Sequence, residues 1–384
     1  MADSPSPSSR PPFQFPASPA TVDVRVIDTY VPPKQGGSVI PDPVTSQKRL
    51  TISSHSGTRL YLKPGVFWEP TLPGFEGPDA PVYTFLISRG ERHVLFDLGV
   101  RADWENLPPR IVEVVQATTR VTGRGRDVAS VLDDDAAQNR GDGPGPSVRS
   151  VDIEAIIWSH SHFDHVGDPS RFPPSTSLVV GPGVPAVAWP GYPSDPNGTV
   201  LDSDAAGRAV REISFTSGGA GGHPLRIGRF NAVDYFGDGS FYLLNAPGHA
   251  PGHMCGLART TAEPPTFVFM GGDACHHAGV IRPSAHLPLP PSEARQVAWK
   301  VDTCAPFFEV ARNNLFPDYA AATETVAKIQ ELDACDNVFV VLSHDDSLGG
   351  RLPLFPDCVN EWHKSGLREG TRWLFCKEFE SVKA

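Results

Sequence analysis

The residues of this chain that could do chemistry are five histidines and two aspartates, in an order that suits a site for two metal ions. Four of them belong to the hexapeptide 160–165, and the other three follow later apolar runs. Imidazole and carboxylate groups are ligands that suit zinc and similar divalent ions, and seven are enough for two ions. The set is His160, His162, Asp164, His165, His249, Asp273 and His344.

These ligands lie just after stretches rich in strand-forming residues. The stretches and the ligands that follow them are 153–158 with His160, 241–244 with His249, 267–270 with Asp273, and 338–342 with His344. Buried strands have such runs, and ligands gather where strands end and loops begin. Gly248 and Gly272, each directly before a ligand, allow the tight backbone that brings short side chains to one point. We therefore expect strands from both halves of the chain to meet at one site.

Other segments predict the elements around this site. Residues 22–28 alternate like a strand, and 82–87 with 93–97 have the pattern of a hairpin. The two prolines at 108–109 predict the start of a helix. The spacing of apolar residues over 319–329, behind Asp318 as a cap, predicts an amphipathic helix that packs on the core.

The chain is expected to form a single domain over residues 21–384, after a disordered tail rich in Pro and Ser at 1–20. Two insertions are expected, near 133–150 and 285–330. The first is acidic and then rich in Gly and Pro, which is typical of a surface loop. It does not divide two domains, because the candidate ligands beyond it need strands from both sides.

Composition narrows the possible partners. The chain has 384 residues, 40% hydrophobic and 20% charged, as in a globular protein with a sizeable core. A net charge of −11 without any basic run argues against a nucleic-acid surface. No stretch approaches the roughly 20 apolar residues of a membrane helix, and the start of the chain lacks the apolar core of a signal peptide. The six scattered cysteines are expected to be reduced, and the location cytoplasmic.

The motif His-x-His-x-Asp-His at 160–165, followed by the three later ligands, resembles the signature of the metallo-β-lactamase superfamily. The segment 247–253 is similar to a loop of its lactonase and glyoxalase II branches, and 271–277 looks closest to fungal lactam and lactone hydrolases. The resemblance covers about residues 22–345. It implies an α/β fold, the four-layer αββα sandwich, with the site at one edge of the two sheets.

The resemblance also implies how the ligands are shared. One ion would be held by His160, His162 and His249. The other would be held by Asp164, His165 and His344, and Asp273 would bridge the two ions. The ions would be two divalent cations, with zinc preferred and manganese or iron compatible with the same ligands.

Two positions distinguish this chain from other branches of the superfamily. The main class of zinc β-lactamases has a cysteine where this chain has Asp273, which argues against antibiotic hydrolysis. The bacterial acyl-homoserine-lactone lactonases have a tyrosine three positions after the bridging aspartate, where this chain has His276. That place therefore keeps a polar proton donor near the metals.

These residues lead to a mechanistic hypothesis. Two ions that share a water lower its pKa towards about 7, which creates hydroxide at neutral pH. This hydroxide would open a lactam or lactone ring of a small molecule, and a xenobiotic compound is one option. Asp164 could pass on a proton, and His276 could donate one to the carbonyl or the leaving group. The oligomeric state stays open, with a homodimer as one option.

Other functions remain as alternatives. An acyl thioester presents a similar carbonyl to the same hydroxide, as in glyoxalase II or polyketide-releasing thioesterases. A phosphodiesterase is less consistent with the absence of a basic surface, and a persulfide dioxygenase with one iron would not need the second ligand set. A non-catalytic module on this fold would be expected to lose ligands, whereas this chain keeps all seven.

Several further residues have two interpretations. His253 could orient a ligand or pack in its loop, and Asp97 could accept a hydrogen bond from a ligand histidine. Cys275 has no base at motif spacing, so a buried thiol is favoured. His276 and His277 could also be plain exposed-loop residues. The aromatic residues in the Pro/Gly-rich loops could line a substrate pocket, although packing at the edge of the core is the simpler interpretation. They are Phe67, Trp68, Phe75 and Trp189.

Overall fold

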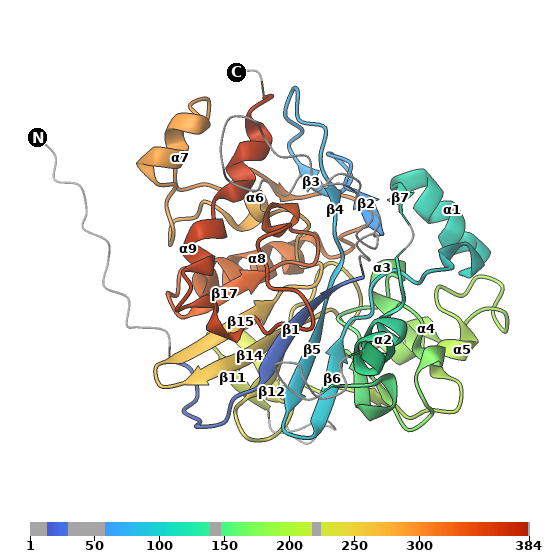
Figure 1. Cartoon of the computed structure of the whole chain (residues 1–384). Helices are drawn as coiled ribbons and strands as arrows, with labels where there is room; N and C mark the ends of the chain where they lie inside the picture. The colour runs from blue at the N-terminus through green and yellow to red at the C-terminus, as the bar shows by residue number, and fades with distance from the viewer. Residues whose placement is uncertain (1–13, 30–57, 124, 139–146, 217–223, 383–384) are drawn as a thin grey trace, which may run out of the picture.

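A computed structural model describes residues 14–29, 58–123, 125–138, 147–216 and 224–382 of this chain. Two six-stranded sheets form its centre (Figure 1). The first sheet has the order β1 (Asp23–Asp28), β5 (Tyr83–Arg89), β6 (Arg92–Phe96), β8 (Ile153–Ile157), β9 (Ser177–Val180) and β10 (Val210–Glu212). The second has the order β11 (Pro224–Ile227), β12 (Phe230–Asp234), β13 (Phe241–Asn245), β14 (Met254–Ala262), β15 (Pro265–Met270) and β17 (Val338–Val341).

Strand direction changes within each sheet. In the first sheet β1, β5 and β6 are antiparallel neighbours, whereas β6, β8, β9 and β10 run parallel. In the second sheet the strands are antiparallel up to β15, which pairs in parallel with β17. Five short strands lie outside these sheets: β2 (Arg59–Tyr61), β3 (Trp68–Glu69), β4 (Asp79–Ala80), β7 (Val121–Thr122) and β16 (Glu309–Val310).

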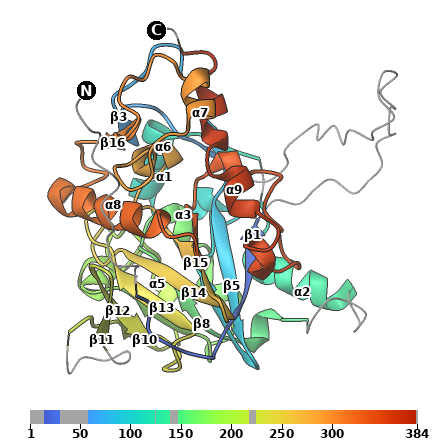
Figure 2. The same ribbon diagram turned by 90° about the vertical axis from the view of Figure 1, so that its left-hand side faces the viewer.

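The helices cover the outer faces of the two sheets (Figures 1 and 2). In chain order they are α1 (Pro109–Thr118), α2 (Val128–Gln138), α3 (Phe163–Val166), α4 (Val184–Ala188), α5 (Asp202–Ala205), α6 (Ala278–Ile281), α7 (Pro291–Gln296), α8 (Tyr319–Asp333) and α9 (Leu367–Thr371). The helices α2 and α4 lie on the first sheet, and α6 and α8 lie on the second.

Alternation along the strands produces these four layers. Successive side chains of a strand point to opposite faces. Phe85 and Ile87 therefore belong to the apolar cluster between the two sheets, while Leu86 packs under α2 and α4. On the second sheet Leu243 faces the same central cluster, and its neighbour Leu244 packs under α8. The observed layers confirm the αββα fold that the sequence predicts.

Most of the predicted elements are present. The strand at 23–28, the hairpin of β5 and β6, and the helix behind the two prolines all form. The helix α8 begins behind Asp318, whose carboxylate accepts a hydrogen bond from the backbone N–H of Ala321 at 2.9 Å. Its apolar positions pack on the second sheet, which confirms the amphipathic pattern.

The tail expected at 1–20 does not extend to residue 20. Residues 1–13 lie outside the described part of the chain, but the ring of Phe15 stacks on Phe267 at 4.2 Å. The backbone carbonyl of Pro16 also accepts a hydrogen bond from Arg259. An aromatic side chain and one charge-assisted hydrogen bond anchor this segment although its composition is typical of a linker.

The segments expected to be insertions differ in content. Part of the loop near 133–150 lies outside the described residues, and 133–138 are the end of α2. The segment 285–330 contains α7, β16 and the first part of α8. All six cysteines are free thiols. No helix among the described residues is long and apolar enough to cross a bilayer.

Candidate metal centre

The seven predicted ligands meet at one edge of the sandwich, beyond the ends of strands from both sheets. His160 follows β8 after two residues, and the next three ligands lie at the start of α3 or within it. His249, Asp273 and His344 follow β13, β15 and β17 of the other sheet. Residues that lie 184 positions apart in the sequence are thus neighbours in space, as the strand pattern predicts.

The ligand atoms form two groups that share one carboxylate. The first group consists of His160, His162, His249 and Asp273, and the second consists of Asp164, His165, Asp273 and His344. Within each group the potential ligand atoms lie within 4.8 Å of one another. All are buried except His162, which is half-buried, so the centre opens towards solvent beside that residue.

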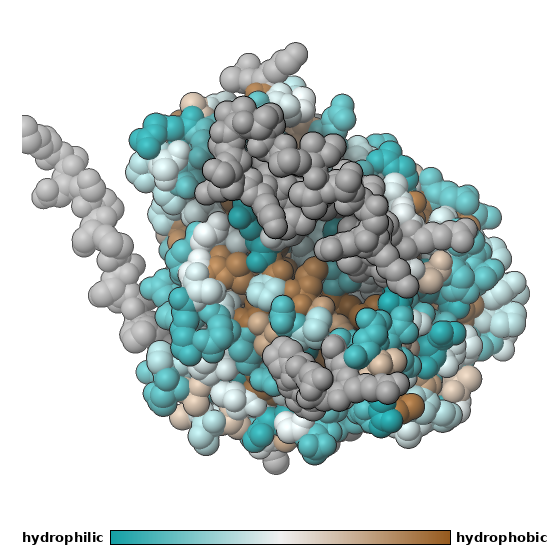
Figure 3. Space-filling view, in the orientation of Figure 1, coloured by the Kyte–Doolittle hydropathy of each residue, from teal (hydrophilic) through white to brown (hydrophobic). Residues whose placement is uncertain are grey.

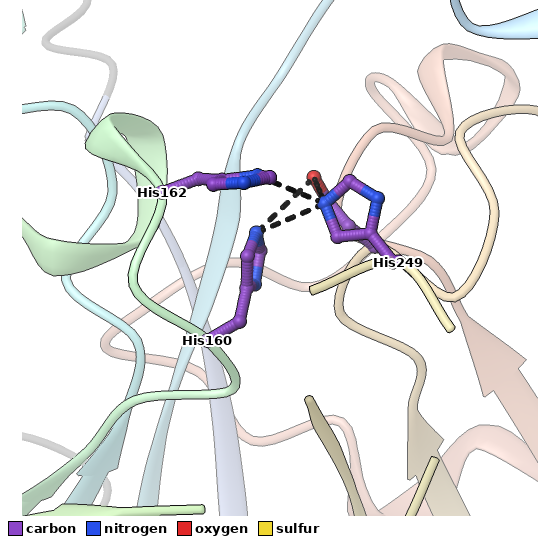
Figure 4. A group of neighbouring side chains, drawn as sticks. His160, His162 and His249 are labelled. Carbon is purple, nitrogen blue, oxygen red and sulfur yellow. Dashed lines mark hydrogen bonds and ion pairs between the residues drawn. The ribbon is translucent and has the colours of Figure 1, made fainter. Parts of the chain in front are cut away.

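The first group brings three imidazole nitrogens together (Figure 4). Nε2 of His249 lies 3.1 Å from Nε2 of His160 and 2.9 Å from Nδ1 of His162. Four ligands around a tetrahedral zinc, each at about 2.0–2.1 Å, lie about 3.3 Å from one another. The observed spacings are therefore close to those of a coordination shell.

The second group contains buried atoms that lack a hydrogen-bond partner within the described part of the chain. They are Nε2 of His165, Oδ1 of Asp273 and Nε2 of His344. The carboxylate oxygen lies 3.0 Å from the first nitrogen and 3.1 Å from the second. Buried polar atoms without a partner are costly. A cation held by these atoms would satisfy all of them, so the donor set fits a divalent metal.

The two groups differ in their electrostatics. Burial, together with the charges of neighbouring histidines, holds the pKa values of His160 and His249 well below the usual range. In the second group burial opposes a charge on His344, but Asp273 and Asp164 outweigh it and raise its pKa to about 10. The carboxylates thus attract positive charge to the second group even before a metal is considered.

Asp97 supports the second group from behind, as its position after β6 suggested. Its carboxylate is fully buried; it accepts the backbone N–H of Ser159 at 2.6 Å and lies 2.8 Å from Nδ1 of His165. Burial raises the pKa of Asp97, although His165 opposes that shift. Its backbone has φ of 64°, which is uncommon outside glycine. Such local strain points to a functional constraint on this residue.

His253 binds the backbone of Asp273 rather than merely packing in its loop. Its Nδ1 lies 2.9 Å from the carbonyl oxygen of Ala246, and its Nε2 accepts the backbone N–H of Asp273 at 3.0 Å. The first contact requires a hydrogen on Nδ1, and the second requires a bare Nε2, so the ring is neutral. Burial lowers the pKa of His253 to about 4, which keeps it in this form.

Two further hydrogen-bond partners of the candidate ligands could not be predicted from the sequence. Nδ1 of His344 lies 2.9 Å from the backbone carbonyl of Pro81, and Nδ1 of His160 lies 3.0 Å from the hydroxyl of Ser159. Both contacts leave Nε2 of the ring free to face the centre. A carbonyl from position 81 could not be assigned from the sequence, because any residue type provides one.

Gly248 and Gly272 have the tight backbone that their positions suggest. Gly248 has φ of +129°, and an added methyl group would lie 2.2 Å from the backbone nitrogen of Ala322 in α8. Gly272 has φ of +51°, and its added methyl group would lie 2.9 Å from Nε2 of His253. Side chains at these positions would displace the loops that carry two of the ligands.

His276 lies inside the centre and is not an exposed-loop residue. It is 2% exposed, and its Nε2 lies 3.1 Å from Oδ2 of Asp273. Its ring is parallel to that of His344, with centroids 5.4 Å apart. Phe67 and Phe316 pack against it with ring centroids at 4.8 and 5.6 Å. Its Nδ1 is buried without a hydrogen-bond partner.

The other loop aromatic residues and Cys275 belong to the packed core and do not line the centre. Trp68 and Phe75 pack around His277, and Trp189 stacks on Trp158. Of the aromatic residues predicted in loops, Phe67 thus contacts the candidate donor, whereas the others complete the core. Burial raises the pKa of the Cys275 thiol, which makes it a poor nucleophile. Phe316 was not singled out by the sequence, since one aromatic residue in a long loop carries no pattern.

Comparison with known proteins identifies the family. The profile of the metallo-beta-lactamase superfamily matches residues 141–259. The chain is 52% identical to the metallo-hydrolase mfmC of Annulohypoxylon moriforme, over 97% of this chain and 92% of that protein. It is 41% identical to the gamma-lactamase FDB1 of Fusarium pseudograminearum, over 96% of this chain and 85% of that protein. The chain therefore belongs to the metallo-β-lactamase superfamily of hydrolases.

A solved structure agrees with this fold. An N-acyl homoserine lactone hydrolase with its product N-hexanoyl-L-homoserine bound at the catalytic metal center superposes with a TM-score of 0.52. The alignment covers 88% of this chain and 99% of that chain at 16% identity. At that identity the likeness concerns the architecture of the two proteins.

Proposed function

We propose that this protein is a metal-dependent hydrolase that opens a lactam or lactone ring of a small molecule. The observation that carries the proposal is the pair of ligand groups joined by Asp273, with their buried unpartnered atoms. The similarity to a gamma-lactamase along almost the whole chain supports a cyclic amide or ester as the substrate class. We further propose that both groups are filled, with zinc as the native ion.

When bound, two divalent ions would ionise a shared water and polarise the substrate carbonyl. The residues of the chain perform the remaining tasks. The imidazoles of His160, His162 and His249 would bind a metal as neutral ligands, so they add no charge of their own to the site. The buried walls around them exclude bulk water, which strengthens every electrostatic interaction inside.

Asp164 is placed to handle a proton. Its Oδ2 lies 3.3 Å from Nε2 of His344 and 3.5 Å from Nε2 of His165. Burial would raise the pKa of Asp164, but these histidines outweigh it and lower that pKa, so the carboxylate is ionised. An ionised carboxylate can accept a proton from the attacking water and pass it to the leaving group.

His276 is the proposed donor to the carbonyl oxygen or to the leaving group. It reaches the shared carboxylate without belonging to either ligand group, and its ring lies between the ligands and the apolar side chains Phe67 and Phe316. A donor fixed in this manner requires no reorganisation during the reaction.

The test measures metal content and hydrolysis together. Protein stripped of metal by a chelator should lose ring-opening activity on a panel of lactones and lactams, and zinc or manganese should restore it. Activity that survives complete removal of metal would exclude the mechanism. Acyl thioesters belong in the same panel, because a preference for them over every ring substrate would replace the proposed function with thioester hydrolysis.

A further inference from the structure

The residue next to the proposed donor points away from the metal centre. His277 is 3% exposed, and aromatic rings surround it. The ring centroids lie 5.0 to 5.8 Å from that of His277, and they belong to Trp68, Phe75, Phe308, Phe375 and Phe379. The last two come from the C-terminal end of the chain, which lies beyond the region that resembles the family signature.

Hydrogen bonds fix the protonation of this histidine. Nδ1 of His277 accepts the backbone N–H of Gly279 at 2.9 Å, so that nitrogen carries no hydrogen. In the neutral ring the hydrogen is then on Nε2, which lies 3.2 Å from Oε2 of Glu378. His277 therefore donates to Glu378 and at the same time caps the N-terminus of α6.

The same short helix is attached to the C-terminal segment at its other end. Arg282, which follows α6, forms a bidentate ion pair with Asp333 at 2.6 and 2.8 Å. It also donates to the backbone carbonyl of Arg372 at 3.1 Å. Figure 1 shows this C-terminal segment, in red, beside α6 and α8. Glu378 lies in its last 3-10 helix (Leu374–Phe379).

Within the described part of the chain, the ring of His276 lacks the second hydrogen bond that orients His160, His165 and His344. Nε2 of His276 lies 3.1 Å from the carboxylate of Asp273, but Nδ1 has no hydrogen-bond partner among the described residues, so no second hydrogen bond orients the ring. Its position follows from packing and from the backbone that it shares with His277. A displacement of about 1 Å at a reacting group can cost about 100-fold in rate.

From these contacts we infer that Glu378 is a positioning residue that holds His276 in place through His277. The C-terminal segment thereby contributes to the active site, although between residues 367 and 382 no side chain contacts a candidate ligand. This inference depends on the proposed function, in which His276 donates a proton.

The kinetic experiment compares four single variants, His276→Ala among them, and one double variant of the full chain loaded with zinc. Glu378→Ala should lower kcat about tenfold, with KM and metal content nearly unchanged. Glu378→Gln keeps an acceptor oxygen and should restore most of kcat. Glu380→Ala removes an exposed carboxylate two positions away and should behave as wild type.

The double variant tests the route through His276. If Glu378 acts through that residue, His276→Ala combined with Glu378→Ala should have the kcat of His276→Ala alone. Effects that multiply would show an independent role and overturn the inference. A parallel rise in KM or loss of metal in Glu378→Ala would also overturn it.

A second measurement does not require catalysis. In ¹⁵N-histidine-labelled protein, the imidazole signals of His276 should shift or broaden in Glu378→Ala and stay unchanged in Glu378→Gln and Glu380→Ala. Unaltered His276 signals in Glu378→Ala would overturn the inference even if the protein opened no ring. If the signals change but the protein opens no ring, Glu378 still positions His276 and the proposed function is wrong.

Discussion

The candidate metal ligands and His276 lie a few ångströms apart, yet three of the ligand histidines are held differently from His276. Three of the ligand histidines have a hydrogen bond to the nitrogen that faces away from the centre: His165 to Asp97, His344 to the carbonyl of Pro81, and His160 to Ser159. His276 contacts Asp273 through Nε2 and packs against Phe67 and Phe316, but no described residue binds its Nδ1.

The difference shows that hydrogen bonds orient these candidate ligands, whereas packing places His276. Hydrogen bonds fix the tautomer and direction of a ligand, which a metal requires within narrow limits. Packing against a ring fixes its place but not its tautomer. His276 is supported by side chains at positions 67, 273 and 316 and through its neighbour His277, whereas three of the candidate ligand histidines are supported by groups that lie close to strand ends.

The largest effect is expected for Asp273→Ala, which removes the carboxylate common to both groups. Metal content should fall, and ring-opening activity should drop by about 10³-fold or more, since bound metal supplies several kcal/mol of transition-state stabilisation. Metal analysis and kcat/KM measure both. His363→Ala, at an exposed histidine, is the control and should retain both metal and rate. Full metal content in Asp273→Ala would contradict the shared-ligand arrangement.

His276→Ala is expected to have the next largest effect and to separate the two modes of support. The variant should keep its metal and lose about 10²–10³-fold in kcat, as expected for removal of one proton donor. Metal analysis measures the metal content of the variant, and steady-state kinetics measures its kcat. Loss of metal would make His276 a ligand, and an unchanged kcat would remove it from the reaction.

Asp97→Asn should lower the metal affinity of the second group. The backbone should stay in place, because asparagine tolerates positive φ. The amide oxygen can replace only part of the carboxylate, which receives hydrogen bonds from both Ser159 and His165. Metal affinity should fall about 10- to 100-fold, as measured by titration with a competing chelator. Equal affinity in variant and wild type would show that packing alone orients His165.

The smallest effect on activity is expected at Asp204, a buried acid in α5 with 1% exposure. Burial raises the pKa of Asp204 from 3.8 to about 7, whereas the histidines around the equally buried Asp273 lower its pKa. The folded protein thus binds the proton of Asp204 more tightly than the unfolded chain does. Its contribution to stability is complete below pH 4 and is lost as the pH rises to about 7.

Asp204→Asn removes this titration. The melting temperature of the variant should rise relative to wild type between pH 4 and 7, and the difference should stay constant above pH 7. Asp202→Asn, at an acid whose pKa is lowered by hydrogen bonds from Ser194, should show no such rise. A pH-independent difference for Asp204→Asn would mean that Asp204 is ionised in the folded protein.

The candidate ligands and their place at strand ends could be predicted from the sequence alone, whereas the four layers were expected from the resemblance to the superfamily. Alternating and continuous apolar runs specify strands, since a strand has only two faces to bury, and ligand residues at strand ends then converge. The helix after Asp318 and the tight turns at Gly248 and Gly272 follow from equally local rules. These features depend on residues that are close in the chain, so their pattern is visible there.

The residues that support His276 could be identified only from the folded structure. The partners of His276 and His277 come from positions 67, 316 and 378, and none belongs to a periodic pattern. The carbonyl of Pro81 and the anchoring of residues 14–20 are contacts of the same kind. Such contacts depend on the packing of distant segments. Because this packing has no repeating spacing along the chain, no sequence pattern predicts it.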